Sequence, residues 1–326
     1  MKAVSLFSGG LDSQLAVCLI REQGIEVVAV NFQTPFFGGG VYIFEAARTL
    51  GIHLEVIDIS EEYMEVLKNP RYGYGKNMNP CIDCHGFMLR QAGQFMEKIG
   101  AGFIITGEVL GQRPKSQTKS ALGAVDKLSG YRGYIVRPLS ARLLPPTIPE
   151  EKGWLDRNRL LDISGRSRTR QMELAQRYGL KDYPSPAGGC LLTTESISRR
   201  LRKLFELRPE AGAEDMHILK YGRHFYIGQD NLLVIGRKHE ENEALTALAR
   251  RDDYLLKVAT HPGPLAVLRS MGQLTGDDIQ AAAALVARYS DARDEKNALV
   301  RIWQPNRPGQ KITVTPTPVA QTPSPV

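Results

Sequence analysis

The first part of the chain alternates short apolar runs with stretches in which apolar residues recur at helical spacing. A run that is apolar at nearly every position is typical of a strand buried on both faces of a parallel sheet. Most of the helical stretches end at a glycine, the usual residue after a helix. We therefore expect strands and helices to alternate, with strands at 2–7, 25–32, 53–57, 103–106 and 134–136 and helices at 11–23, 42–50, 87–99 and 158–178. This order predicts an α/β fold in which helices cover both faces of a parallel sheet.

The pattern changes near residue 195. Two alternating runs at 224–227 and 231–235 flank a turn and predict a hairpin, and helices are expected at 242–251 and 279–289. We assign residues 1–195 to the α/β domain and 196–303 to a second, smaller α+β domain. Residues 304–326 are rich in Pro and Thr and poor in apolar side chains, so a disordered tail is expected there.

The composition is that of a globular protein. The 326 residues suit two domains, and a hydrophobic content of 42% is enough for ordinary cores. No apolar run reaches the length of a membrane helix, and the first one is too short for a signal peptide. The chain is therefore expected to be cytoplasmic, with no membrane partner.

Charge is spread unevenly along the chain. Residues 113–203 hold 19 Lys and Arg against 8 Asp and Glu, a local charge of +11 within a total of +7. Arg166, Arg168 and Arg170 form the densest part. Such a block attracts polyanions such as nucleic acid, although composition alone fits a solvated face of charged helices equally well.

A glycine-containing turn joins the first strand to the first helix. It reads Ser8-Gly9-Gly10-Leu11-Asp12-Ser13. Glycines allow backbone N–H groups to close on a phosphate, and the following helix adds its N-terminal dipole. Ser8 and Ser13 supply hydroxyl donors, and Asp12 is a candidate ligand for Mg²⁺ or its water. The alternative is an ordinary strand–turn–helix in which Asp12 caps the helix.

The full string resembles the SGGxDS motif of the PP-loop, or N-type, ATP pyrophosphatases. The resemblance implies a HUP/PP-loop domain that binds ATP and Mg²⁺, cleaves ATP between the α and β phosphates and adenylates an oxygen of its substrate. Asn31 and Phe32, at the end of the second strand, resemble the segment that lines the adenine pocket in that superfamily.

A second string follows the fourth strand. Thr106-Gly107-Glu108-Val109-Leu110-Gly111-Gln112 and Ser116-Gln117-Thr118 resemble the corresponding segment of the tRNA 4-thiouridine synthetases, with one additional residue between the two parts. A later Arg137-Pro138-Leu139 also matches that family. The resemblance implies that Gly107, Glu108, Gln112 and Gln117 belong to the nucleotide site, because ligands of open α/β sheets bind at the carboxyl ends of the strands.

Four cysteines are present. Cys18 lies on the apolar face of the first predicted helix and is expected to pack in the core. Cys81 and Cys84 have CxxC spacing ahead of the third predicted helix, whose N-terminus is expected to lower the pKa of their thiols. Cys190 follows a glycine-containing loop. Three thiolates can hold three irons of a [4Fe-4S] cluster and leave the fourth iron open to carry sulfur.

Asn79-Pro80 before Cys84, and Gly189 before Cys190, resemble the two cysteine sites of the tRNA 2-thiouridylases. Cys81 stands where that family often has aspartate, and this departure favours a cluster. Three hypotheses remain open: a [4Fe-4S] cluster on Cys81, Cys84 and Cys190, a persulfide or disulfide pair of Cys84 with Cys190, and structural zinc with His85 as a fourth ligand.

The hairpin region of the second domain resembles the NFACT-R RNA-binding module. The shared residues lie between 221 and 242, and Arg223, His224, Arg237 and Lys238 are candidate phosphate contacts. Tyr221 or Phe225 is a candidate for stacking on a base. A two-strand ribbon with solvated charges is the alternative interpretation.

Together the resemblances imply an ATP-dependent tRNA sulfurtransferase with Asp12, Cys84 and Cys190 as its catalytic residues. Its partners would be tRNA and a sulfur donor, either sulfide or a persulfide derived from a cysteine desulfurase. One alternative is a PP-loop enzyme that adenylates a small molecule for sulfur or amide transfer. A second is an RNA-binding adaptor with a degenerate nucleotide site.

Overall fold

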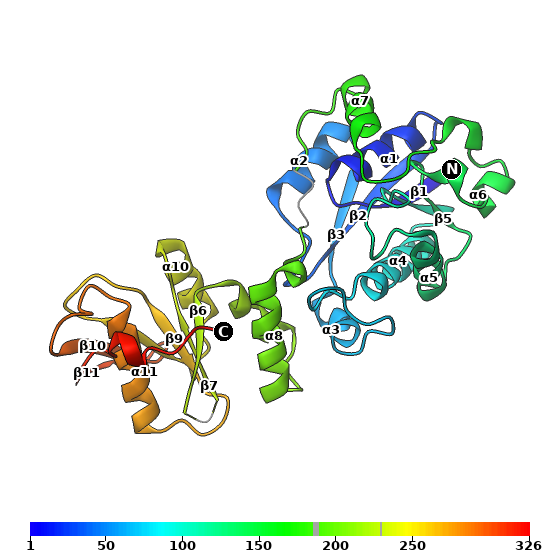
Figure 1. The fold of residues 1–326 in the computed structure, drawn as a ribbon. Coiled ribbons are helices and arrows are strands. Elements are labelled where there is room, and N and C mark those ends of the chain that lie inside the picture. The colour runs from blue at the N-terminus through cyan, green and yellow to red at the C-terminus, as the bar shows by residue number, and fades with distance from the viewer. Residues whose placement is uncertain (185–188, 229) are drawn as a thin grey trace. The chain divides into compact units, whose positions relative to one another are not determined.

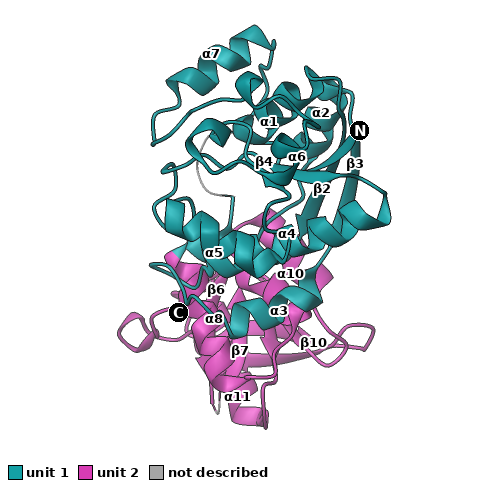
Figure 2. Cartoon of the chain, turned by 90° about the vertical axis from the view of Figure 1, so that its right-hand side faces the viewer, with its two compact units in different colours: residues 1–194 teal, residues 195–326 magenta. Residues whose placement is uncertain are grey.

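The computed structural model describes residues 1–184, 189–228 and 230–326. The chain divides into two compact units, residues 1–194 and 195–326 (Figure 2). Each unit has its own sheet and its own apolar core, and each is described by itself below.

The first unit is built on a five-stranded parallel sheet (Figure 1). The strands are in the order β3-β2-β1-β4-β5, so the chain moves outward in one direction from β1 and later in the other. Strand β4 is fully buried and β1 and β2 nearly so, which explains their continuous apolar sequences. The strands are β1 (Lys2–Leu6), β2 (Glu26–Gln33), β3 (His53–Asp58), β4 (Phe103–Thr106) and β5 (Ile135–Val136).

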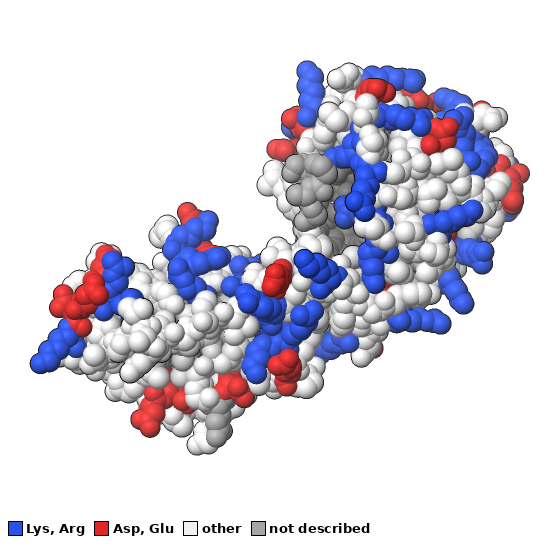
Figure 3. Space-filling model, viewed as in Figure 1, with Lys and Arg blue, Asp and Glu red and all other residues white. Residues whose placement is uncertain are grey.

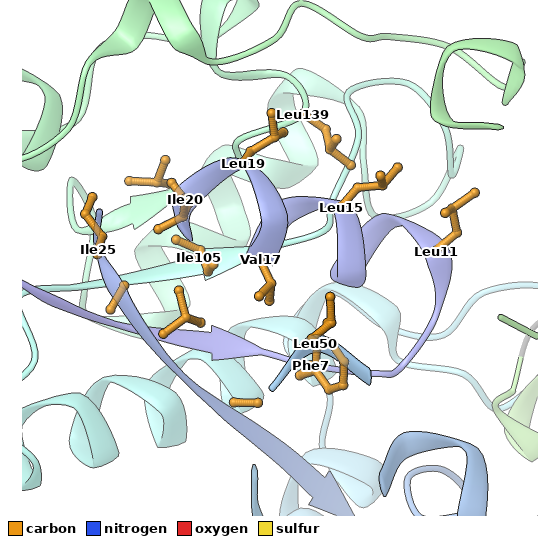
Figure 4. Close-up of a cluster of buried hydrophobic side chains, with 14 of the residues drawn as sticks. Phe7, Leu11, Leu15, Val17, Leu19, Ile20, Ile25, Leu50, Ile105 and Leu139 are labelled. Carbon is orange, nitrogen blue, oxygen red and sulfur yellow. The ribbon is translucent and has the colours of Figure 1, made fainter. Parts of the chain in front are cut away.

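Helices cover both faces of this sheet. One core lies between the sheet and the helix that follows β1, and the side chains of that helix point into it (Figure 4). A second core lies on the opposite face, under the helix that precedes β4. The α-helices of the unit are α1 (Leu11–Arg21), α2 (Val41–Leu50), α3 (Ser60–Lys68), α4 (Cys81–Lys98), α5 (Lys119–Ser129), α6 (Ile148–Glu151) and α7 (Thr169–Arg177). Short 3-10 helices are η1 (Ala141–Leu143), η2 (Arg157–Arg159) and η3 (Leu191–Thr193).

The five predicted strands of this unit are confirmed, each within two residues at either end. Helix α4 begins six positions before the predicted start at Phe87, because its first turns are polar and lack the apolar periodicity that marked the rest. This early start places the CxxC sequence inside the helix. The long helix expected from 158 to 178 is wrong, since only η2 and α7 form there.

The second unit contains a six-stranded antiparallel sheet in the order β11-β10-β8-β9-β7-β6. The predicted hairpin is confirmed as β6 (Arg223–Ile227) and β7 (Asn231–Ile235), which pair in antiparallel register. The other strands are β8 (Tyr254–Val258), β9 (Ala266–Arg269), β10 (Ala298–Trp303) and β11 (Gln310–Val314). The helices are α8 (Glu195–Leu207), α9 (Ala213–Met216), η4 (His217–Lys220), α10 (His239–Leu248), α11 (Gly276–Arg288) and η5 (Val319–Gln321).

Strand β7 has apolar cores on both of its faces. Leu233 and Ile235 point into the core beneath α11, and Leu232 and Val234 point into the core that contains Leu245 of α10. Alternate residues of a strand face opposite sides of the sheet, so a strand covered on both sides is buried along its whole length.

The prediction of a disordered tail is wrong. Residues 310–314 form β11 at the edge of the sheet, and Val314 is buried against the core. The backbone N–H of Val326 donates a hydrogen bond to the carbonyl of His224. A strand with few apolar side chains can form when a neighbouring strand supplies backbone hydrogen bonds, and the composition of the segment does not reveal such pairing. Among the described residues, no helix has the length and apolar character needed to cross a membrane.

Candidate active site

The loop between β1 and α1 is fixed by its own hydrogen bonds. Gly9 has φ +73°, a left-handed conformation that favours glycine. The hydroxyl of Ser13 donates to the carbonyl of Gly10 at 2.8 Å, and Gln14 Nε2 donates to the carbonyl of Gly9 at 2.8 Å. Helix α1 has no side-chain cap, so its first backbone N–H groups remain open to a ligand at the loop.

The end of β4 lies directly against this loop. Strands β1 and β4 are neighbours, with Leu6 opposite Thr106. A Cβ atom at Gly107 would stand 2.5 Å from the backbone nitrogen of Ser13 and 2.6 Å from the carbonyl carbon of Asp12. The order of strands also reverses between β1 and β4, which is where open α/β sheets bind ligands. The two motifs therefore meet at one point of the fold.

Several buried polar atoms of this loop, of the segment after β4 and of the start of α7 have no well-formed hydrogen bond among the described residues. They are Asp12 Oδ1, Gln117 Oε1, Arg168 Nε and both amide atoms of Gln171. The other carboxylate oxygen of Asp12 accepts a hydrogen bond from Gln112 Nε2 at 3.1 Å. Buried polar groups in folded proteins are nearly always paired. The unpaired atoms fit a polar, charged ligand such as a triphosphate with Mg²⁺, for which Asp12 offers a free carboxylate oxygen.

Burial raises the pKa of Asp12, while the Gln112 amide, the Arg168 and Arg113 guanidinium groups and the nearby Gln171 amide oppose the rise. The two arginines therefore place positive charge beside the loop. The sequence interpretation assigned Arg168 to the basic tRNA-binding stretch together with Arg166 and Arg170. It missed that Arg168 faces the phosphate loop, because α7 and the loop meet only in the tertiary structure.

Glu108 belongs to a buried ionic network. Its carboxylate accepts from His85 Nδ1 at 2.8 Å and from Arg137 Nε at 2.9 Å, and the guanidinium of Arg137 also contacts Asp126 at 2.7 Å. Burial favours the neutral acid, but Arg137 and His85 outweigh it and lower the pKa of Glu108 to about 2. Glu108 therefore fixes the end of β4, and its carboxylate is occupied by protein partners.

Asn31 and Phe32, predicted near the adenine, are both buried at the end of β2. The amide of Asn31 donates to the carbonyl of Phe7 at 2.8 Å and accepts from the backbone of Gly39 at 3.2 Å. Phe32 packs in the core on the α4 face of the sheet. Both side chains are thus occupied by contacts within the protein, so only backbone groups of this segment remain available to a ligand.

The predicted cysteines lie on two segments that a hydrogen bond holds together. Cys81 opens α4, Cys84 is one turn later, and Cys190 immediately precedes η3. Asn77, just before α4, donates its amide to the carbonyl of Thr193 at 2.6 Å. Residues 185–188 of the loop before Cys190 lie outside the described residues.

Asp83 organises the approach to these cysteines. Its carboxylate accepts backbone hydrogen bonds from Arg71 at 2.8 Å and Tyr72 at 3.0 Å. Asn79 donates to the sulfur of Cys81 at 3.1 Å. The polar residues of the CxxC turn thus hold the loop at 69–80 against α4.

The expected lowering of the thiol pKa at a helix N-terminus is wrong for Cys84. Burial raises the pKa of Cys84 well above its usual range, and the neighbouring Cys190 and Cys81 add to the rise. Burial likewise raises the pKa of Cys190 to about 11. At Cys84 desolvation outweighs the helix dipole because this thiol is buried, while Cys190 is half-buried. Cys18 is half-buried against the core of α1, and burial raises its pKa to about 11.

Tyr63 of α3 is a member of this site that the sequence did not reveal. Its side chain is 1% exposed, and its hydroxyl has no well-formed hydrogen bond among the described residues. The pKa of Tyr63 is raised first by burial and then by the nearby Cys84 and Cys190. The hydroxyl is therefore a buried donor beside the sulfur of Cys84.

The described residues contain no group of three or more His, Cys, Asp or Glu arranged to hold a metal ion. The donor chemistry of three cysteines suits an iron–sulfur cluster, but their present arrangement does not form a metal site. The bond from His85 Nδ1 to Glu108 leaves Nε2 available for zinc, but the described residues do not gather three or more ligating groups around it.

In the second unit, two of the predicted RNA contacts are wrong. His224 and Phe225 are each 1% exposed, so neither reaches a ligand. Burial lowers the pKa of His224 to about 3, so this imidazole is neutral at pH 7. Arg223, Arg237 and Lys238 remain accessible.

Comparisons with known proteins fall on the same two units. Residues 1–142 match the family model described as Thiamine biosynthesis protein (ThiI), and residues 222–324 match the model described as NFACT protein RNA binding domain. The tRNA-specific 2-thiouridylase MnmA of Sulfurimonas denitrificans is 33% identical over 43% of this chain and 43% of its own length. A probable tRNA sulfurtransferase of Thermococcus kodakarensis is 29% identical over 42% of this chain and 36% of its own.

The chain therefore spans less than half the length of these curated relatives. A solved 4-thiouridine synthetase–RNA complex with bound ATP aligns with a TM-score of 0.40 and 22% identity, covering 67% of this chain and 52% of that one. The two domain matches agree with the two sheets of the structure and with the motifs at the end of β1 and β4. The first unit is thus similar to the PP-loop tRNA-thiolation enzymes, and residues 222–324 of the second unit match the model of an NFACT-type RNA-binding domain.

Proposed function

We propose that this protein is an ATP-dependent tRNA sulfurtransferase of the cytoplasm. The observation that carries the proposal is the set of unpaired buried polar atoms around the loop at 8–13, in the same unit as the three gathered cysteines. The family of the first unit and the RNA-binding type of the second unit support tRNA as the substrate.

The loop residues Ser8, Gly9, Gly10 and Ser13 would bind the phosphates of ATP through backbone N–H and hydroxyl groups. Mg²⁺ would be held at Asp12 and would neutralise charge on the phosphates. Arg168 and Arg113 add positive charge where the pyrophosphate leaves. The protein's part in this step is positioning and charge stabilisation.

In the first reaction a carbonyl oxygen of a uridine base attacks the α-phosphorus of ATP. The bond between the α and β phosphates breaks, pyrophosphate leaves, and the base loses its ring N–H proton to solvent. The product is an O-adenylated base whose carbon is open to a sulfur nucleophile. AMP then leaves with the original base oxygen when sulfur adds.

Sulfur would be delivered at Cys84, with Cys190 as the second thiol. A terminal persulfide sulfur on Cys84 attacks the activated carbon and expels AMP. Cys190 then attacks the inner sulfur, which releases the thiolated base and leaves a Cys84–Cys190 disulfide for a thiol reductant to open. A [4Fe-4S] cluster on Cys81, Cys84 and Cys190 remains a separate proposal for the same cysteines.

The test uses the purified chain, unmodified tRNA and ATP labelled at the α-phosphate. AMP and pyrophosphate formed only with tRNA, and thiouridine formed with a sulfide or persulfide donor, would support the proposal. ADP as the product, or turnover with a small molecule and no dependence on tRNA, would contradict it. Iron and sulfide analysis of protein purified without oxygen decides the cluster, since metal-free protein that is fully active excludes it.

A further inference from the structure

The second unit contains a cavity whose charge is of one sign. It has a volume of about 700 Å³ and lies among the beginning of β6, the end of β7, β8, the start of α10, the loop before β9 and the end of α11. Its described lining includes no Asp or Glu. Its cationic residues are Arg223, Arg237, Lys238, Lys257, Arg288 and Arg293. In Figure 3, Lys and Arg side chains gather around α10 of this unit.

Three of these cations have no carboxylate partner among the residues that the structure describes. Arg237, Lys238 and Arg293 each pair with an acidic residue outside the cavity. Arg223, Lys257 and Arg288 have no such pair, so their charge is available to a ligand. Unpaired cations that converge on one cavity repel each other and are stabilised by an anion.

The sheet register adds to this repulsion. Lys257 on β8 stands directly opposite Arg301 on β10. Like charges on directly opposed residues of neighbouring strands destabilise a sheet. Binding of an anion beside Lys257 would offset this cost.

The cavity also has a backbone donor and a fixed wall. Helix α10 begins at His239 with Lys238 as N-cap and has no side-chain cap. Among the described residues the N–H of His239 is open, whereas that of Glu241 donates to the carbonyl of Lys238. Gly263 packs against the end of α11, where a Cβ atom would stand 2.6 Å from Cβ of Ser290. This close approach brings the loop before β9 next to the arginines of α11.

The one tyrosine ring in the described lining is already covered. Arg223 lies over the ring of Tyr289 with its guanidinium carbon 4.9 Å from the centroid, and Phe225 contacts the same ring at 5.8 Å. Among the described lining residues, only the imidazole of His239 remains as a ring on which a base could stack. The cavity offers charge and N–H donors, which bind phosphates and do not read the sequence of bases.

We propose that this cavity binds the sugar–phosphate backbone of RNA, with Arg223, Lys257 and Arg288 contacting phosphates. The partner rests on the proposed function, but the site itself is independent of the sulfur chemistry. A cavity of this volume with cations on several elements suits a run of phosphates better than one small anion. Binding here is independent of sequence and depends steeply on salt.

The test compares two triple variants of the full chain that lose the same charge. Arg223→Gln/Lys257→Gln/Arg288→Gln alters the cavity, and Lys296→Gln/Arg307→Gln/Lys311→Gln alters three exposed cations of the same unit outside it. Fluorescence anisotropy would measure binding of tRNA and of an unrelated RNA hairpin over a series of KCl concentrations. The cavity variant should bind both RNAs at least tenfold more weakly. Its slope of log affinity against log salt concentration should become shallower by about 2, because it contacts fewer phosphates.

Equal weakening of RNA binding by the two triple variants would overturn the proposal. Complete displacement of RNA from the wild type by millimolar inorganic phosphate would also overturn it, because the cavity would then bind one small anion and not a run of phosphates. Because Arg223 packs on Tyr289, the double variant Lys257→Gln/Arg288→Gln supplies a second measurement that leaves this stacking in place. If the wild type thiolates tRNA and the cavity variant binds RNA normally, the RNA-binding role of the cavity is refuted and the proposed function stands. If the cavity variant loses RNA binding as expected but the wild type does not thiolate tRNA, the proposed function is refuted and the role of the cavity stands.

Discussion

Replacing Gly107 with alanine tests the contact between the end of β4 and the phosphate loop. The new Cβ would stand 2.5 Å from the backbone nitrogen of Ser13 and 2.6 Å from the carbonyl carbon of Asp12. Carbon atoms in proteins pack at about 3.5–4.0 Å, so one of the two backbones must move. Neither neighbour is the end of a flexible side chain, and we therefore expect the loop to be displaced.

Overpacking of this kind costs about 1–3 kcal/mol. If the displacement falls on the loop, ATP affinity drops by roughly tenfold to a hundredfold, because about 1.4 kcal/mol corresponds to a factor of ten. Calorimetric titration of ATP·Mg²⁺ measures the affinity, and urea unfolding measures how much of the cost falls on stability. Pyrophosphate release in the presence of tRNA should fall along with ATP affinity.

Gly123→Ala is the matched control. Gly123 lies in the middle of α5 on an exposed face, and a Cβ atom there meets nothing within 4 Å. Alanine in a helix interior should stabilise the protein by about 0.5–1 kcal/mol and leave ATP affinity unchanged. Wild-type ATP affinity and unchanged stability in Gly107→Ala would refute the claim that this contact sets the loop.

Three further predictions concern buried groups. Glu108→Gln leaves the Arg137 guanidinium without its main partner and should destabilise the first unit by about 3–5 kcal/mol in urea unfolding. The pKa of Glu108 is lowered to about 2, so the wild type keeps this stabilisation above pH 4.5 and loses it as the pH falls toward 2. His224 has a pKa lowered to about 3, so protonation favours the unfolded state below pH 6.5, and the second unit should lose about 1.4 kcal/mol per pH unit in this range, a loss that His224→Gln abolishes. Tyr63→Phe removes a buried hydroxyl without a well-formed bond and should leave the free energy of unfolding equal or higher. It should nevertheless slow thiouridine formation relative to AMP formation, because no hydroxyl remains beside Cys84 to donate to the sulfur that this residue carries during the reaction.

Each of these predictions has a control in the same chain. Glu195→Gln removes an exposed carboxylate at the start of α8, and His239→Gln removes a histidine whose side chain is 80% exposed. Tyr72→Phe alters a tyrosine that is 38% exposed. Equal effects of Glu108→Gln and Glu195→Gln on stability would contradict the ionic network. Acid sensitivity that persists in His224→Gln would assign it to another group, and equal slowing of AMP and thiouridine formation in Tyr63→Phe would refute its role at sulfur.

The sequence alone determined the parallel sheet of the first unit and the location of the glycine-containing loop between β1 and α1. Both follow from short-range patterns: continuous apolar runs for strands such as β4, and glycines where the chain must turn tightly between β1 and α1. The motif after β4 was also readable, because strand ends of one parallel sheet share an edge. The hairpin of the second unit was also readable, because the alternation of its strands and the turn between them are short-range patterns.

Only the tertiary structure decided which polar groups are buried and which segments far apart in the chain meet. It brought the charge of Arg168 near Asp12, buried Cys84 and half-buried Cys190 so that burial raised their pKa, and placed Tyr63 beside them. It also buried His224 and added the polar tail to the sheet as β11. Desolvation and strand pairing depend on neighbours far away in the sequence, and no local pattern of residues encodes them.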